Sequence, residues 1–281
     1  MKSSRKSSRK TTRRILAVCL TAALAAPLAA CSPLDVFGPH ANSEIMALAK
    51  QASADTASGD ERWGELRAFH ADQLKNEARR LCGTDASGAP PSTCNVDYED
   101  TDLPPSGDTA ALVVQTAKAA GKVPEDSVDL VVAQAIDAVA ASDEPLALLN
   151  TDGPIDDTDA LEAAKLLANA EYAVDYGLDI ATAYGDEQLQ ARIDKLRTLH
   201  DARLSSLHDA FPTDAMPARE AGYEIPGGAP TNPAEAAAFV DKLESDLVER
   251  WRTAAADATS VDWRTAAIIL AGHAQRAAET A

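Results

Sequence analysis

Residues 166–181 read LLANAEYAVDYGLDIA, and this stretch decides the fold. Its core-type positions recur every three or four residues, which places them on one face of an α-helix. The residues on that face are Leu167, Glu171, Val174 and Leu178. A glutamate within an apolar face has to find a partner when it is buried. The stretch therefore predicts a helix that brings one carboxylate into a helical core.

The three segments that follow show the same spacing, and each carries one polar residue within its apolar face. These residues are His200, Glu244 and His273. With Glu171 they come in the order Glu, His, Glu, His, one from each of four helices. We therefore expect the four side chains to meet inside a four-helix bundle.

Helical spacing extends through most of the chain, in blocks separated by Gly, Pro and capping residues. The blocks are about 43–57, 60–82, 107–121, 125–142, 157–184, 186–210, 233–257 and 261–279. No segment has a convincing strand pattern. Aromatic residues make up only 4% of the sequence, β-branched runs are scarce, and the abundant alanine favours helices. We predict an all-α protein with eight helices.

The two halves of the chain resemble one another. Arg67-x-x-His70 can be aligned with Arg197-x-x-His200, and the segment from Ser127 can be aligned with the segment from Ser260. The offsets of about 130 residues suggest a duplicated four-helix unit. In each half a long connection joins the second helix to the third, which is the ferritin-like arrangement. We expect an N-terminal unit at 43–150 and a ferritin-like domain at 151–281.

The second half resembles uncharacterised ferritin-like lipoproteins of actinobacteria. The resemblance covers about residues 157–279 and rests on the order of three segments. They are LLANAEYAVDYGLDIA (166–181), LRTLHDARLSSLHDAF (196–211) and GYEIPGGAPTNPAEAAAFVDKLESDLVERW (222–251). The resemblance implies a ferritin-like bundle and implies no established activity.

Ferritin-like metalloproteins carry a Glu three residues before each of the two histidines. Here those positions hold Arg197 and Leu270, so two carboxylates that would bridge metals are missing. An Arg directed at the same centre would repel a metal and pair with a carboxylate. We therefore expect a buried network in which Arg197 is the charge partner, and no cofactor. Binding of iron or another divalent metal by Glu171, His200, Glu244 and His273 remains the alternative.

The N-terminal segment has the features of an export signal. Seven basic residues precede a twelve-residue apolar stretch, 15–26, which is too short to span a bilayer. Leu28-Ala29-Ala30-Cys31 follows and resembles a bacterial lipobox. We predict a signal peptide at 1–30, lipid attachment at Cys31, a tether at 31–42 and a location on the extracytoplasmic face of the cell membrane. Arg13-Arg14 leaves both the general and the twin-arginine export routes open.

The remaining cysteines, Cys82 and Cys94, flank a loop rich in Gly, Ser and Pro. In an oxidising compartment such a pair is expected to form a disulfide. A metal or redox role is less expected because there is no C-x-x-C motif and no adjacent histidine.

The mature chain would be strongly acidic. Loss of the seven basic residues lowers the formal net charge from −18 to −25. Such a surface repels phosphate backbones, so we expect no nucleic-acid partner. The sequence also has no phosphate-binding loop and no nucleophile–base pair. We expect a non-enzymatic lipoprotein that binds an unidentified envelope protein or ligand, with a metal-binding or redox protein as the alternative.

Overall fold

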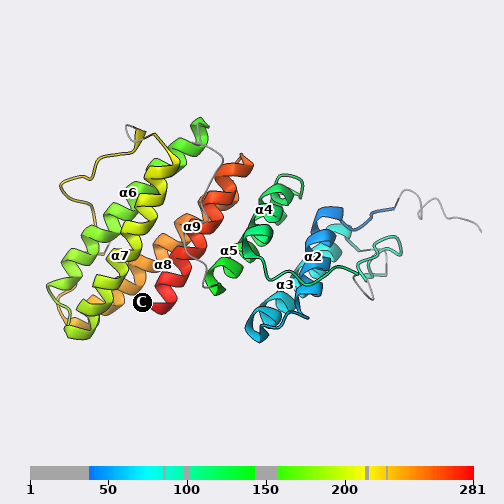
Figure 1. Ribbon diagram of the computed structural model, residues 1–281, viewed down its shortest axis with the longest axis horizontal. Coiled ribbons are helices and arrows are strands. Elements are labelled where there is room, and N and C mark those ends of the chain that lie inside the picture. Colours follow the sequence, from blue (N-terminus) through cyan, green and yellow to red (C-terminus); the bar gives the residue numbers. More distant parts are fainter. Residues whose placement is uncertain (1–37, 85–86, 98–101, 143–156, 213–214, 226) are drawn as a thin grey trace, which may run out of the picture. The chain divides into compact units, whose positions relative to one another are not determined.

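The protein is all-helical, as the sequence predicts. The structure, a computed structural model, describes residues 38–84, 87–97, 102–142, 157–212, 215–225 and 227–281 (Figure 1). Within these residues there are eight α-helices and no strand. The helices are α2 (Ser43–Asp55), α3 (Glu61–Cys82), α4 (Thr109–Ala120), α5 (Glu125–Ala141), α6 (Thr158–Thr182), α7 (Glu187–Ala210), α8 (Pro233–Asp257) and α9 (Val261–Thr280).

Capping side chains explain where most of these helices begin. In seven of the eight, the residue before the first turn accepts a hydrogen bond from a backbone N–H of that turn, which would otherwise have no partner. The caps are Asn42, Asp60, Asp108, Asp157, Asp186, Asn232 and Ser260. Helix α5 instead follows Pro124, which has no side-chain cap.

Helices α6 to α9 form a four-helix bundle. Short connections join α6 to α7 and α8 to α9, and the long segment 211–232 joins α7 to α8. The contacts run between α6 and α7, α6 and α8, α7 and α9, and α8 and α9. Its core contains Trp251 and Trp263, the largest fully buried side chains among the described residues. This is the arrangement predicted from the sequence, with one long crossover between two helical hairpins.

The N-terminal helices have a smaller apolar cluster of their own, and two of them also join the core of the bundle. Helices α4 and α5 pack against α9, and α5 also contacts α8. The larger apolar cluster therefore contains residues from each of the six helices α4 to α9. Helices α2 and α3 pack on each other and, more weakly, on α4 and α5. Residues 38–281 consequently form one compact unit. The expected boundary near residue 150 lies in the segment 143–156, outside the described residues.

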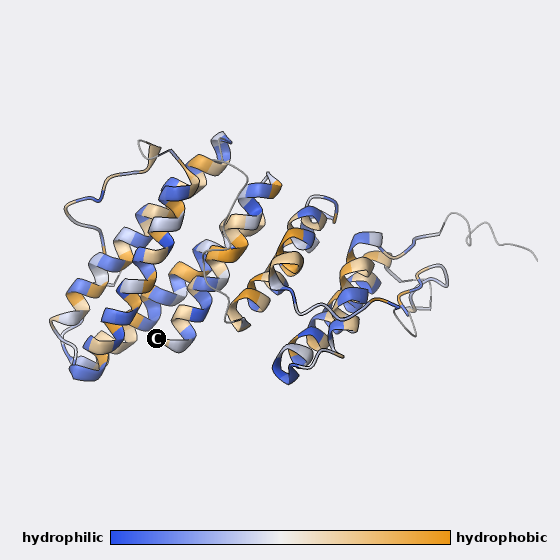
Figure 2. Ribbon diagram, viewed as in Figure 1, coloured by the Kyte–Doolittle hydropathy of each residue, from blue (hydrophilic) through white to orange (hydrophobic). Residues whose placement is uncertain are grey.

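The two halves use the same helix pairs. Helices α2 to α5 contact one another in the pairs that correspond to those of α6 to α9, and residues 83–108 correspond to the long crossover. The duplication itself is not confirmed by this pairing and stays a prediction. Figure 2 shows that hydrophobic residues dominate α4, whereas α3 and α7 alternate hydrophobic and hydrophilic positions. A helix with few polar positions is expected where it is covered on more than one side.

A glycine permits the close approach of α5 and α9. A Cβ atom on Gly272 would lie 2.5 Å from Cβ of Val139 and 2.9 Å from the carbonyl oxygen of Ile136. Beside this contact Arg252 of α8 donates a hydrogen bond to Asp137 of α5, over 3.1 Å. The α4–α5 hairpin is thus joined to the bundle by both apolar packing and an ion pair.

The loop after α3 is closed by the cysteine pair expected from the sequence. The Sγ atoms of Cys82 and Cys94 lie at disulfide distance, 2.00 Å, and both residues are buried. Within this loop Thr93 donates a hydrogen bond from its hydroxyl to the carbonyl oxygen of Pro39, and the His40 ring contacts the Thr93 carbonyl oxygen. The loop therefore fixes the start of the described chain against α3.

Reduction of this disulfide should destabilise the protein. Closing a loop of this length reduces the entropy of the unfolded chain, which is worth about 3 kcal/mol. We expect the midpoint of urea unfolding to fall on addition of a reductant. The double variant Cys82→Ala/Cys94→Ala should begin at the lower midpoint and not respond to the reductant. An unchanged midpoint in the reduced wild-type protein would show that the pair contributes nothing to stability.

None of the described helices has the length and apolar character needed to cross a membrane. The predicted signal segment and Cys31 lie outside the described residues.

Candidate functional site

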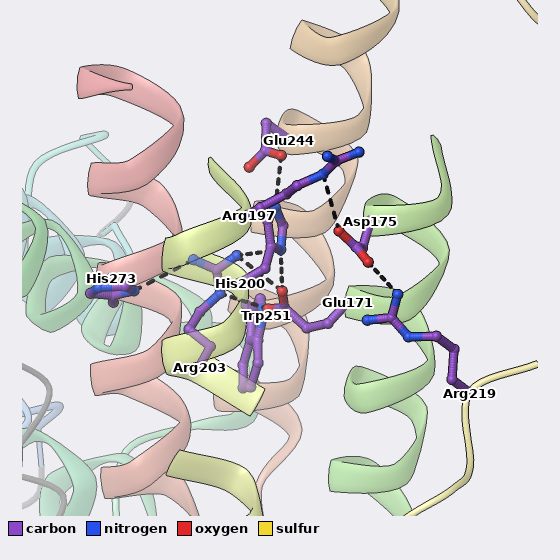
Figure 3. Close-up of polar contacts among 9 residues, drawn as sticks. All are labelled: Glu171, Asp175, Arg197, His200, Arg203, Arg219, Glu244, Trp251 and His273. Atoms are coloured by element: carbon purple, nitrogen blue, oxygen red, sulfur yellow. Dashed lines mark hydrogen bonds and ion pairs between the residues drawn. The ribbon is translucent and has the colours of Figure 1, made fainter. Parts of the chain in front are cut away.

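The four polar residues predicted to point into the bundle are all buried there. Glu171 comes from α6, His200 from α7, Glu244 from α8 and His273 from α9. Figure 3 shows them converging from four helices. They do not form one cluster, however, because His273 lies on the far side of an arginine, Arg203.

His200 lies between two carboxylates. Its Nε2 is 3.0 Å from Oε1 of Glu244, and its Nδ1 contacts Oε2 of Glu171. An imidazole can donate through both nitrogens only when it is protonated. The geometry therefore fits an imidazolium that bridges α6 and α8 from α7.

Arg203 is the buried charge partner of Glu171. Its Nε lies 2.6 Å from Oε1 and its Nη2 lies 3.0 Å from Oε2 of that carboxylate. This two-point contact is the strongest geometry for an arginine–carboxylate pair. Nη2 also lies 2.8 Å from Nδ1 of His200. When His200 is protonated both groups are donors, and they share Oε2 of Glu171 as their acceptor.

The prediction that Arg197 fills this role is wrong. Arg197 points away from the interior and pairs with Asp179 and, over 3.6 Å, with Asp175. Asp175 also pairs with Arg219, which comes from the crossover between α7 and α8 (Figure 3). Residues 197 and 203 each lie three positions from His200, and the twist of the helix brings only residue 203 to the core side.

Trp251 completes the surroundings of Glu171. Its indole Nε1–H donates to Oε1 over 2.7 Å. Trp251 was expected in the apolar face of its helix but not as a hydrogen-bond donor. Glu171 thus accepts from Trp251, Arg203 and His200, which compensates a carboxylate with no exposed surface.

The charges in this network balance. Burial alone would raise the pKa of Glu171, but the charges of Arg203 and His200 outweigh burial and lower this pKa to about 2. Burial alone would lower the pKa of His200, but Glu171, through charge and hydrogen bonding, raises it to about 9. The protonated His200 and the ionised Glu171 therefore stabilise each other, with Arg203 and Glu244 as their further partners.

His273 is held neutral. Burial, and after it the positive charge of Arg203, lowers the pKa of His273 to about 4. Its Nδ1 lies 3.4 Å from Nη1 of Arg203, so the neutral ring can accept a hydrogen bond from the guanidinium. His273, predicted as the second histidine ligand of a metal, is therefore a hydrogen-bond partner of Arg203.

These residues do not fit a metal ion. Both oxygens of Glu171 and both ring nitrogens of His200 already have partners, and a fixed positive charge, Arg203, lies in their midst. A cation at this centre would have to displace Arg203, because ligand groups must be free of competing donors. No group of three or more His, Cys, Asp or Glu residues in the described part of the chain is arranged to hold a metal.

The same region is recognisable as a family domain. Residues 160–280 match the model of DUF4439, a domain of unknown function. A DUF4439 domain therefore covers the bundle α6 to α9. Searches of curated proteins and of solved structures gave no match.

A related polar cluster lies outside the DUF4439 domain, in α3. Arg67 and His70 are almost wholly buried, and Nη1 of Arg67 lies 3.1 Å from Nδ1 of His70. Nε of Arg67 donates to Asp55 of α2 over 2.9 Å. Burial, and then Arg67, lowers the pKa of His70 to about 4. Both halves therefore bury a His beside an Arg, but here the Arg precedes the His, whereas in the DUF4439 domain it follows.

The DUF4439 network should make stability depend on pH. The folded protein holds the His200 proton more tightly than the unfolded chain does, because the pKa rises from 6.5 to about 9. The stabilisation is therefore complete below pH 6.5 and is lost as the pH rises through about 9. We expect the free energy of unfolding to fall across this range in the wild-type protein and to stay nearly level in His200→Gln.

The control for this prediction is His208→Gln. His208 lies in the last turn of the same helix with a partly exposed side chain, so this variant should keep the wild-type dependence on pH. If His200→Gln and the wild-type protein lost stability in parallel between pH 6.5 and 9, His200 would not be the protonated bridge.

Proposed function

We propose that the protein is a lipid-anchored protein of the extracytoplasmic membrane face that binds another envelope component and is not an enzyme. The observation that carries this proposal is the closed network around Glu171. Its carboxylate, the imidazole of His200 and the guanidinium of Arg203 use one another as partners in the interior. Catalytic acids and bases need access to a substrate, and these groups face one another instead.

The sequence supports the location. A basic segment, an apolar core and Cys31 follow each other in the order typical of exported lipoproteins. A body with a net charge of −25 gains no attraction from anionic lipid headgroups. Attachment would therefore come from the lipid on Cys31, and the protein surface would remain available to a partner.

The anchor can be tested by replacing Cys31. We expect the wild-type protein to incorporate a labelled fatty acid, to sediment with membranes and to be cleaved by protease added outside the cytoplasmic membrane. Cys31→Ala should lose the label and leave the membrane fraction. Cys19→Ala is the matched control, because Cys19 lies within the apolar stretch that is removed. Retention of the fatty-acid label by Cys31→Ala would contradict lipid attachment at Cys31.

Metal analysis separates this proposal from the metal-binding or redox alternative. Protein purified from its native membrane should contain no stoichiometric iron, manganese or zinc, because Arg203 and His200 already occupy both oxygens of Glu171. A stoichiometric metal that disappears in Glu171→Ala and His200→Ala would overturn the binding proposal in favour of the alternative.

A further inference from the structure

A groove runs between α6 and α8 on the surface of the DUF4439 domain, outside the buried network. It encloses about 500 Å³. Its apolar lining includes Ala163, Leu166, Leu167, Ala170, Ala254 and Trp263. Leu166 is 72% exposed, the highest value for a large hydrophobic side chain among the described residues. A single exposed leucine is ordinary on a protein surface, but Leu166 extends the apolar surface of this groove.

The border of this groove is acidic. Asp159 lies on α6, near the start of that helix, and Asp246, Glu249 and Asp257 lie along α8. Lys242 pairs with Asp246, which leaves three carboxylates opposite a single cation, Arg250. The groove is therefore negative as well as apolar, and it repels anionic ligands.

The groove has the length of a short helix. Its lining residues extend from Asp159 to Ala170 on α6 and from Asp246 to Asp257 on α8. Three turns of helix on each side, at 1.5 Å per residue, correspond to roughly 16 Å. An amphipathic helix places apolar side chains on one face at positions i, i+3, i+4 and i+7 and can lay that face in such a groove.

We propose that the α6–α8 groove binds a cationic amphipathic helix of a partner protein. The apolar face of that helix would cover Leu166 and the partly exposed alanines beside it, Ala163, Ala170 and Ala254. Its Lys or Arg residues would face Asp159, Glu249 and Asp257. The charge of the border argues for this occupant over an anionic lipid or a nucleic acid. The inference rests on the proposed binding function and specifies the class of partner.

A model peptide provides the test. The probe is a fluorescent helix of about 14 residues, with Leu at the i, i+3, i+4 and i+7 positions and Lys elsewhere. The full chain should bind it, more weakly at high salt. Leu166→Lys and Glu249→Lys should each weaken binding roughly tenfold or more. Leu166→Lys places a charge against the apolar face of the probe, and Glu249→Lys repels its lysines.

Matched variants on other helices serve as controls. Phe69→Lys replaces another exposed hydrophobic residue, on α3, and Asp201→Lys reverses an exposed acid on α7. Both should bind the probe like the wild-type protein. A peptide with Glu in place of Lys should not bind, and a peptide of scrambled order should bind more weakly.

Other outcomes would overturn the inference. They are no binding of the probe, equal losses in the groove variants and in the controls, or a wild-type dimer that Leu166→Lys converts to a monomer, which would assign the groove to a second copy of the chain. Lipid labelling of Cys31 and the metal content do not depend on the groove. A failure here with an intact anchor therefore refutes the class of partner and not the proposed function.

Discussion

Arg203→Met should lower the free energy of unfolding by about 3–5 kcal/mol, the largest loss that we expect from one substitution. The variant leaves Glu171 buried without the cation that makes two hydrogen bonds to it. Removing one partner of a buried ion pair is far more costly than removing both, because the remaining charge stays desolvated. Urea unfolding monitored by circular dichroism measures the loss.

Two comparisons make this prediction specific. Arg197→Met removes a partly exposed ion-pairing arginine from the same helix and should cost no more than about 1 kcal/mol. The double variant Arg203→Met/Glu171→Gln removes the uncompensated charge and should recover part of the loss. Equal losses for Arg203→Met and Arg197→Met would contradict the assignment of Arg203 as the buried partner.

Gly272→Ala should be the second most damaging of the single substitutions considered. Alanine favours a helix over glycine by up to about 1 kcal/mol, but its Cβ would lie 2.5 Å from Val139 and 2.9 Å from the backbone oxygen of Ile136. Helices α5 and α9 would have to separate, and we expect a net loss of about 1–3 kcal/mol.

Gly177→Ala is the matched control for this change. A Cβ on Gly177 would meet only the end of the Leu243 side chain, which can rotate away, and the gain in helix propensity is the same. We expect this variant to be close to the wild-type stability in urea unfolding. A Gly272→Ala variant as stable as Gly177→Ala would mean that α5 and α9 do not pack closely.

The helices could be predicted to within a few residues because their limits are local. Side chains such as Asp60 and Asp157 supply hydrogen bonds to the first turn wherever they occur. The apolar spacing likewise identified Glu171, His200, Glu244 and His273 as interior residues. Both signals depend on neighbours in the sequence, and they hold without knowledge of the tertiary structure.

The role of Arg203 was missed although the sequence contained a signal for it. Leu196, His200, Arg203 and Leu207 follow at intervals of four, three and four residues, which continues the apolar face of α7. The metal-binding pattern points instead to Arg197, three residues before His200. Strict continuation of the spacing would have indicated the position that is buried.

The packing of α4 and α5 on α9 could not be predicted in the same way. It depends on contacts between residues more than a hundred positions apart, such as Val139 and Gly272. A glycine within a helix shows that something approaches closely, but not which element does so.

The hydrogen bond from Thr93 to Pro39 limits how far the body can move from a membrane. If Cys31 carries the lipid, only eight residue steps separate the anchor from a point fixed to the disulfide loop. A fully extended chain of this length reaches about 29 Å. Pro39 and the disulfide loop would therefore stay near the bilayer, and a partner held in the same membrane would be present at a high effective concentration.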